Sequence, residues 1–324
     1  MNAIEAQGLT RQFGEVTAVD GINLSVQEGE IFGLLGPNGA GKTTTIKMLA
    51  TLLRPTSGKA LVCGHDVSRS PAEVRKSIGI VFQDQALDDR LTGEENLDFH
   101  ARMYGMPARQ RKERVAHVLG LVDLADKARV LVKTYSGGMR RRLEIARGLM
   151  HAPRVLFLDE PTLGLDPQTR RHIWDYIRKL RSEGTTILLT THYMDEADTL
   201  CSRIAIIDKG KILVTDTPAA LKSRVGKDLI TIGTSQASAL AGHLKGMNPI
   251  VHDSSVDISA PSGEKQIPQI LRLADRHRIP VRSISLRKPT LEDVFLHFTG
   301  RTIREEEADV KEVFRRESKM WGRR

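Results

Sequence analysis

The sequence predicts an α/β fold in which a mostly parallel sheet is interrupted by a helical block and followed by a small α+β domain. Five short apolar runs recur along the first part of the chain, at residues 30–35, 77–82, 154–158, 185–190 and 204–207. Strands that are apolar on both faces are typical of parallel sheets covered by helices. Between the second and the third run, apolar residues recur at helical spacing instead. The pattern of apolar and polar residues changes again after Thr217-Pro218.

The N-terminal segment has the alternation of half-buried strands. Apolar and polar residues alternate over 4–7, 16–19 and 22–26. We expect Gly14 and Gly21 to form the turns between these strands, because glycine marks turns. This segment predicts an antiparallel β subdomain beside the main sheet.

The helical block extends from about Glu94 to Met150. Within 109–121, Val115, Val118 and Leu119 recur at helical spacing among charged residues. We therefore expect a helical subdomain at about residues 85–150, inside a first domain of residues 1–221.

The C-terminal part predicts a separate small domain. Segments 228–232 and 279–286 have the composition of strands, and 267–278 that of a helix. Residues 222–300 therefore form an accessory α+β domain of a plausible size. The charge-rich segment 301–324 is expected to be a partly helical or frayed tail.

Composition narrows the classes of function. The formal net charge of +9 suits nucleic acid, phosphate ligands or an anionic membrane face, whereas 4% aromatic residues argue against base-stacking platforms. No apolar run reaches the length of a membrane span, and the first residues do not resemble a signal peptide. A cytoplasmic location is expected.

Residues 36–43, Gly-Pro-Asn-Gly-Ala-Gly-Lys-Thr, match the phosphate-binding loop pattern. Glycines let backbone N–H groups converge on phosphate oxygens, and the helix that follows favours anions at its N-terminus. Lys42 is predicted to reach the β- and γ-phosphates and the Thr43 hydroxyl to bind Mg²⁺. The nucleotide-binding residues assigned here are Asn38, Gly39, Gly41, Lys42, Thr43 and Thr44.

Three other apolar runs are each followed directly by a polar residue or a pair of them, namely Gln83, Asp159-Glu160 and His192. Ligands of open α/β sheets bind beyond the carboxyl ends of the strands, so these residues are expected to converge on one nucleotide. We assign Asp159 to Mg²⁺, Glu160 to the attacking water as general base, and His192 to the γ-phosphate. Gln83 contacts either the metal or the water. Taken singly, Gln83 and His192 are more simply interpreted as ordinary polar residues.

Residues 136–138, Ser-Gly-Gly, begin a second amphipathic helix. Ser136 is a favoured N-cap, and Gly137 and Gly138 allow an anion to approach the backbone closely. The chain therefore has a second phosphate-binding helix start, far from the first in sequence.

In this order the motifs resemble those of the ABC ATPases, and the resemblance covers about residues 4–220. It implies a P-loop NTPase cassette that hydrolyses ATP with Mg²⁺. It also implies a head-to-tail dimer of two copies, in which Ser136, Gly137 and Gly138 of one copy contact the γ-phosphate held by the other. Asp166, in Gly-Leu-Asp-Pro at 164–167, would belong to the loop that couples the two sites. Phe13 would stack on adenine; its simpler interpretation is a core aromatic residue.

Segments 135–170 and 291–300 are similar to the daunorubicin-resistance group of drug-exporter ATPases. Met139 and Tyr135 stand where many ABC proteins carry Gln and Leu. Because the contacts expected of Ser136 and Gly138 are made by the backbone, we expect activity to survive. Thr290 and Asp293 predict a helix N-cap.

The main hypothesis is an exporter motor at the cytoplasmic face of the membrane, which it contacts through a separate transmembrane permease. The cargo class stays open among drugs, antibiotics, lipids and polysaccharides. The alternative is a soluble ABC ATPase that acts on nucleic acid or ribosomes, which the absence of a second cassette and of a coiled-coil insertion disfavours. A non-catalytic scaffold ranks last because Lys42, Glu160 and His192 are all present.

Overall fold

A computed structural model describes residues 1–84 and 86–300 of the chain. These residues form two compact units, Met1–Pro218 and a second that begins at Ala219. The boundary predicted after residue 221 falls within helix α8 (Pro218–Val225) and stays a prediction. The predicted tail, 301–324, lies outside the described residues.

The main sheet of the first unit has six strands in the order β10-β9-β3-β8-β7-β6. Its neighbours are parallel except for the antiparallel pair β9 and β10. The strands are β3 (Ile31–Leu35), β6 (Ile78–Val81), β7 (Val155–Asp159), β8 (Thr186–Thr191), β9 (Arg203–Asp208) and β10 (Lys211–Asp216). All five apolar runs fall in this sheet, as the sequence predicted.

A second, antiparallel sheet has the order β2-β1-β4-β5. Its strands are β1 (Asn2–Phe13), β2 (Val16–Gln27), β4 (Ser57–Val62) and β5 (His65–Asp66). The turn predicted at Gly21 is wrong, because β2 continues through it. Gly21 has φ +60° and lies where the register with β1 shifts, so the glycine accommodates a bulge inside one strand.

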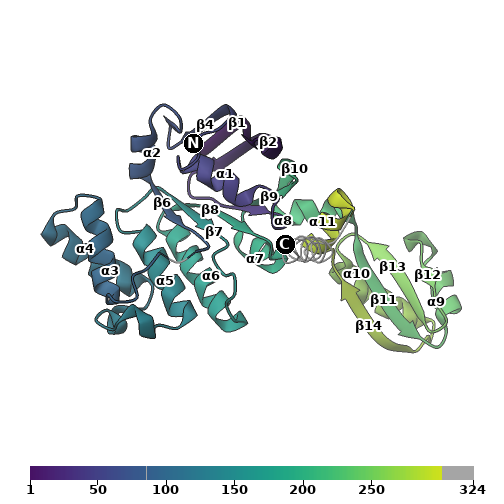
Figure 1. The fold of residues 1–324 in the computed structure, drawn as a ribbon. Helices are drawn as coiled ribbons and strands as arrows, with labels where there is room; N and C mark the ends of the chain where they lie inside the picture. Colours follow the sequence, from purple (N-terminus) through teal and green to yellow (C-terminus); the bar gives the residue numbers. More distant parts are fainter. Residues whose placement is uncertain (85, 301–324) are drawn as a thin grey trace, which may run out of the picture. The chain divides into compact units, whose positions relative to one another are not determined.

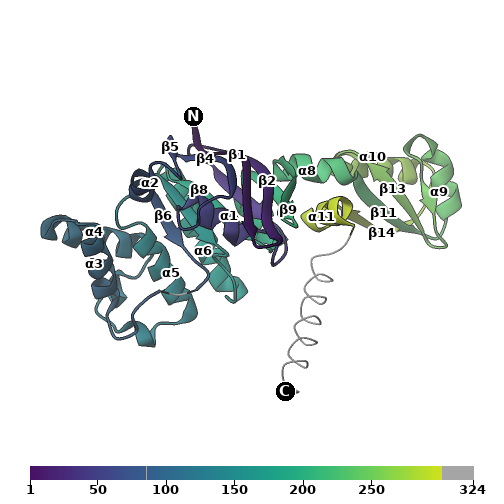
Figure 2. The same ribbon diagram turned by 45° about the horizontal axis from the view of Figure 1, so that its top comes forward.

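Helix α1 (Lys42–Leu49) lies between the two sheets (Figures 1 and 2). Its Ile46, Met48 and Leu49 are fully buried in a cluster that joins both sheets, including Phe157 of β7. Helices α6 (Pro167–Ser182) and α7 (Met194–Leu200) pack against each other, and α7 contacts β3 and β8. The phosphate loop is therefore held by the core on which both sheets depend.

The helical block follows β6. Helix α2 (Pro71–Ser77) leads into β6, and then come α3 (Gly93–Met103), α4 (Ala108–Leu121) and α5 (Gly137–Gly148), with short 3-10 turns at Ala125–Lys127 and Val132–Thr134. Thr92 and Glu95 form a capping box that starts α3. The three long helices pack on one another, and α5 also contacts β6, so the block joins the sheet through α5.

The second unit has a four-stranded antiparallel sheet in the order β12-β13-β11-β14. Its elements after α8 are β11 (Asp228–Thr234), α9 (Ala237–His243), a 3-10 turn (Lys245–Met247), β12 (Ile250–Val251), β13 (Ser255–Ala260), α10 (Gly263–Arg276), β14 (Val281–Arg287) and α11 (Leu291–Thr299). Buried residues of α9 and α10, among them Leu240 and Ile270, share one cluster with Ile232 and Val256 of the sheet. Both helices therefore cover the same face.

The N-cap predicted for α11 is present. Thr290 Oγ1 accepts a hydrogen bond from Asp293 N at 3.2 Å, and Asp293 Oδ2 accepts one from Thr290 N at 2.9 Å. We expect Thr290→Ala to lower the free energy of unfolding of the second unit by about 0.5–2 kcal/mol, because backbone N–H groups lose their acceptor. Chemical denaturation of the full chain measures this, with Thr290→Ser as the control that retains the cap. An alanine variant as stable as the parent would contradict it.

Candidate functional site

The carboxyl ends of four adjacent parallel strands meet at one edge of the main sheet. β3 leads into the phosphate loop, β8 into His192, β7 into Asp159 and Glu160, and β6 towards Gln83. This edge therefore gathers residues that lie more than a hundred positions apart in the sequence, as expected for a ligand site in an open α/β sheet.

The phosphate loop is fixed by its backbone. Gly36 N donates to Thr191 O at 3.2 Å, which ties the loop to β8. Gly41 has φ +102°, and a Cβ atom there would lie 2.5 Å from Ala18 O, so glycine is required. Asn38 and Gly39 are exposed at the tip of the loop, and Thr44 lies in the first turn of α1.

Lys42 is buried at the start of α1. Its Nζ donates hydrogen bonds to Gly36 O at 2.7 Å and Pro37 O at 2.9 Å, and it lies 3.3 Å from Glu160 Oε1. The ammonium group thus lies inside the curl of the loop and beside the carboxylate that follows β7.

Asp159 ends β7 with a side chain that is 1% exposed. Its Oδ1 accepts hydrogen bonds from Thr43 Oγ1 at 3.1 Å and from Thr190 Oγ1 at 2.5 Å. A carboxylate and a hydroxyl oxygen are thereby held together at the mouth of the phosphate loop, and both are oxygen donors of the kind that Mg²⁺ prefers.

Glu160 has a left-handed backbone with φ +47°, which is uncommon for a residue with a side chain. Its N–H is shared between Thr190 O and Thr190 Oγ1, both at 3.1 Å. Its Oε2 lies 3.1 Å from His192 Nδ1. Burial raises the pKa of Glu160, but His192 and the Lys42 ammonium together outweigh burial and place that pKa below its ordinary value. The carboxylate is therefore held ionised.

This pKa shift predicts a pH dependence of stability. Because the folded pKa lies below the ordinary value of 4.5, the ionised Glu160 stabilises the fold fully above 4.5, and the contribution is lost as the pH falls through the folded pKa. We expect the difference in unfolding free energy between the parent and Glu160→Gln to narrow as the pH is lowered through this range. Denaturation at a series of pH values measures it, and a difference that widens towards acid would contradict the expected sign.

Ser136 and Gly138 line a cavity of about 230 Å³. Ser136 Oγ accepts a hydrogen bond from Met139 N at 3.2 Å, so the residue caps α5 as expected. Gly137 opens the same helix and has open space around its Cα, because a Cβ there would meet only Leu165, at 3.9 Å. None of the residues that line this cavity belongs to the phosphate loop.

Asp166 caps α6. Its Oδ1 accepts hydrogen bonds from Gln168 N and Thr169 N, and its Oδ2 accepts one from Thr169 Oγ1. The hydrogen bonds from Thr169 hold the pKa of this carboxyl below its usual range. Within the chain its position is explained by helix capping.

Phe13 and Gln83 lie at the surface. The Phe13 ring is 47% exposed and lies 4.5 Å below the Arg11 guanidinium, so the interpretation as a core residue is wrong. Gln83 is exposed just beyond β6. The structure thus joins Lys42, Thr43, Asp159, Glu160 and His192 in a contacting cluster, whereas Phe13 and Gln83 face outward.

Two residues that bind to this cluster were missed from the sequence. Thr190 reads as one more residue of an apolar strand, yet it holds both Asp159 and Glu160. Arg141 lies in a run of three arginines that resembles a solvated helix face, yet it is 7% exposed. The only signal for Thr190 was a hydroxyl in β8, a buried strand that also contains Thr186 and Thr191.

Comparison with known proteins gives the family. Residues 19–163 match the family described as ABC transporter, and residues 217–299 match the ATP-binding protein DrrA1-3-like, C-terminal domain. The chain is 42% identical to the daunorubicin resistance ATP-binding protein DrrA2 of Streptomyces coeruleorubidus, over 96% of this chain and 98% of the relative. The chain belongs to the ABC transporter ATP-binding proteins.

Other members of the family include the linearmycin resistance ATP-binding protein LnrL of Bacillus subtilis, which is 41% identical over 93% of this chain and all of the relative. The Nod factor export ATP-binding protein I of Ralstonia nicotianae is 39% identical over 93% of this chain and 95% of the relative. This ABC protein is thus an ATP-binding, ATP-hydrolysing transporter subunit, and the nucleic-acid alternative is not favoured.

Solved structures agree with the cassette fold. CbiO1 from Clostridium perfringens, part of the ABC transporter complex cbiONQ, is 29% identical, with a TM-score of 0.64 over 68% of this chain and 91% of that one. The ATP-binding cassette MJ0796, in a dimeric post-hydrolysis state with ADP and Pi, is 28% identical, with a TM-score of 0.60 over 66% of this chain and 98% of that one. No helix among residues 1–84 and 86–300 is long and apolar enough to cross a membrane.

Proposed function

We propose that this ABC protein is the motor of an exporter for a drug-like, lipid or other hydrophobic compound, with its pathway in a separate membrane permease. The observation that carries the proposal is the cluster of Lys42, Glu160 and His192 at the mouth of the phosphate loop. Resistance and export in the names of several relatives support the class of cargo. The chain then works at the cytoplasmic face of the membrane, which it reaches through the permease.

In the proposed mechanism, the phosphate loop and Lys42 hold the β- and γ-phosphates. Lys42 exchanges its hydrogen bonds with loop carbonyls for bonds with phosphate oxygens. Glu160, ionised beside Lys42, orients and deprotonates the attacking water, and His192 donates a hydrogen bond to the γ-phosphate. Phe13, exposed at the end of β1, stacks on adenine.

The oxygen donors of Thr43 and Asp159 fit a magnesium ion. Mg²⁺ binds through one or two protein oxygens, while phosphates and water complete its shell, so the pair at 3.1 Å is sufficient. Gln83, exposed beyond β6, is proposed to contact either the ion or the attacking water. The ion would neutralise charge on the phosphates.

The active unit proposed is a head-to-tail dimer of two copies. Ser136, Gly137 and Gly138 begin helix α5 at a cavity separate from the phosphate loop, so their helix N-terminus is open to the γ-phosphate held by another copy. Asp166, at the cap of α6, lies on the loop that couples the two sites. The dimeric structure of the cassette MJ0796, bound to ADP and Pi, supports a dimer as the active unit.

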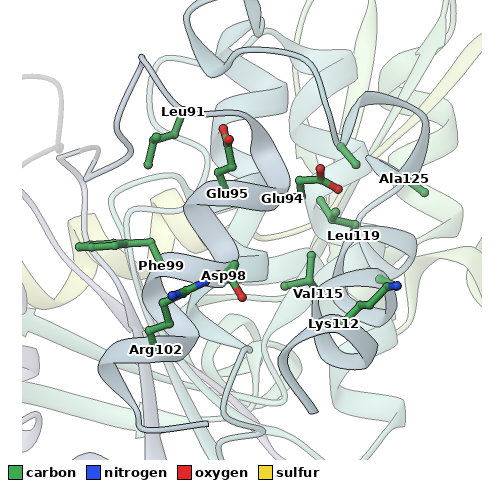
Figure 3. Close-up of a pocket in the computed structure, with 12 residues that line it drawn as sticks. Leu91, Glu94, Glu95, Asp98, Phe99, Arg102, Lys112, Val115, Leu119 and Ala125 are labelled. Carbon is green, nitrogen blue, oxygen red and sulfur yellow. Dashed lines mark hydrogen bonds and ion pairs between the residues drawn. The ribbon is translucent and has the colours of Figure 1, made fainter. Parts of the chain in front are cut away.

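The permease is proposed to bind the helical block. A pocket of about 870 Å³ is lined by α3 and α4, as Figure 3 shows. Its lining combines the exposed ring of Phe99 with Val115 and Leu119, and with the paired charges of Asp98 and Arg102. An apolar pocket with a charged rim suits a short amphipathic segment of the permease.

The pocket gives a prediction for assembly. Phe99 is 60% exposed, so Phe99→Glu costs little packing but places a charge in the apolar part of the pocket. We expect the variant to co-purify with its co-expressed permease at least about tenfold less than the parent does, because a few large side chains carry much of the binding energy of such an interface. An unchanged thermal unfolding midpoint is the control. Equal co-purification would contradict this docking site.

Transport tests the whole proposal. Inside-out vesicles that contain the permease and this chain should accumulate a hydrophobic fluorescent drug when ATP is added. Vesicles with the Glu160→Gln variant should not. Equal accumulation of the drug with both chains would refute the proposal that this chain powers its transport.

A further inference from the structure

Arg141 is a buried side chain beside the site, and the proposed mechanism gives it no role. It lies in the second turn of α5, the helix that Ser136 begins. Its guanidinium donates hydrogen bonds to Pro161 O at 2.7 Å, Phe82 O at 2.6 Å, Asp159 O at 3.0 Å and Glu160 O at 3.1 Å. Four backbone carbonyls from two segments therefore converge on one side chain.

Three of these carbonyls belong to consecutive residues, Asp159, Glu160 and Pro161, at the point where β7 turns away from the sheet. Glu160 adopts φ +47° there without being a glycine, a conformation that persists only where the surroundings enforce it. Thr190 holds the N–H of Glu160 and Arg141 holds its carbonyl, so both ends of the residue are fixed. The direction of the Glu160 side chain depends on this turn.

The fourth carbonyl, Phe82 O, immediately precedes Gln83. The same helix also holds the loop on the far side of Gln83. Glu144 Oε1 accepts a hydrogen bond from Ala86 N at 2.6 Å, and Arg147 Nη1 donates to Ala86 O at 3.3 Å. Arg147 Nη2 also pairs with Glu144 Oε2 at 2.7 Å, so the two side chains that hold Ala86 also stabilise each other.

We propose that Arg141 is a positioning residue: it fixes the Glu160 turn and the start of the Gln83 loop to helix α5, and thereby sets the direction of the carboxylate that activates water. This inference rests on the role proposed above for Glu160. A guanidinium suits the task because its planar fork offers five N–H donors, whereas a lysine ammonium offers three from a single atom.

The test compares Arg141→Gln and Arg141→Lys with the parent in steady-state ATP hydrolysis, equilibrium binding of a fluorescent ATP analogue and thermal unfolding. We expect kcat of Arg141→Gln to fall about 10²-fold, the effect typical of a catalytic group displaced by about 1 Å. KM and the affinity for the analogue should change less than about twofold, because Lys42 and the phosphate loop are untouched. The kcat of Arg141→Lys should lie between that of the parent and that of Arg141→Gln.

Arg114→Gln is the matched control. Arg114 is also partly buried and donates to two carbonyls at the other end of α5, Leu149 O at 2.7 Å and Met150 O at 3.1 Å. Its loss should lower the unfolding midpoint and leave kcat unchanged. If Arg114→Gln lowers kcat as much as Arg141→Gln does, the effect is general destabilisation and the proposal is overturned.

A parent-like kcat in Arg141→Gln, or in Arg141→Lys if the glutamine variant does not fold, would also overturn it. Glu160→Gln separates this failure from that of the proposed function. If Glu160→Gln is inactive while the Arg141 variants are fully active, only the positioning role falls. If Glu160→Gln hydrolyses ATP as the parent does, the proposed role of Glu160 as general base is refuted, and the positioning role of Arg141 is refuted with it.

Discussion

Glu160→Gln should hydrolyse ATP about 10²–10⁴-fold more slowly than the parent, because that is the usual contribution of a general base. The amide cannot accept the proton of the attacking water, but it has nearly the same shape, so the turn that Thr190 holds should survive. ATP binding should persist or tighten, since removing the carboxylate frees Lys42 from its 3.3 Å ion pair. Steady-state hydrolysis and equilibrium ATP binding measure both quantities.

The exposed Glu183, at the end of α6, is the matched control for this charge change. Glu183→Gln should hydrolyse ATP as the parent does. A Glu160→Gln variant with more than about a tenth of the parental kcat would show that another group activates the water, because one effective base contributes more than that.

Lys42→Ala should lose both hydrolysis and tight ATP binding. The ammonium is the buried cation at the centre of the phosphate loop, and hydrogen bonds to charged groups are worth about 1.5–3 kcal/mol each, or roughly 10–10²-fold in affinity. The variant also leaves Glu160 without its cation, so the pKa of that carboxyl should rise. Isothermal titration with ATP measures the affinity.

Lys47→Ala, on the exposed face of the same helix, controls for the loss of one positive charge. Its ATP affinity should equal that of the parent. If Lys42→Ala binds ATP as tightly as Lys47→Ala, the phosphate loop does not bind nucleotide in the way proposed.

The main sheet was predictable because each of its buried strands is a short apolar run, and because Gly41 and Lys42 mark the strand-to-helix turn after β3. Asp159, Glu160 and His192 were predictable as a group because the ends of parallel neighbours meet at one edge of a sheet. Gly21 was misread because a glycine signals a bulge and a turn equally well in one sequence.

Contacts made by backbone carbonyls could not be predicted. Arg141 lies in a highly charged stretch of the sequence. In the structure its side chain is held by four backbone carbonyls from two loops. Because every residue has a backbone carbonyl, the sequence contains no partner residue that would indicate these contacts. The contacts of Thr190 with Asp159 and Glu160 could not be predicted either, because the sequence does not show which neighbouring residue a hydroxyl in a buried strand contacts. The coupling role of Asp166, which the resemblance implies, stays a prediction, and the structure shows that its carboxylate caps α6.

The central claim is that each ATP is held between the phosphate loop of one copy and residues 136–138 of another. Mixing Lys42→Ala with Gly137→Asp tests it most directly. Gly137 has room for a side chain, and an aspartate there would place a negative charge against the phosphate without disturbing the helix start. Neither variant alone should hydrolyse ATP. The mixture should recover hydrolysis, because a mixed dimer retains one site with both halves intact. A mixture as inactive as its components would contradict the shared site.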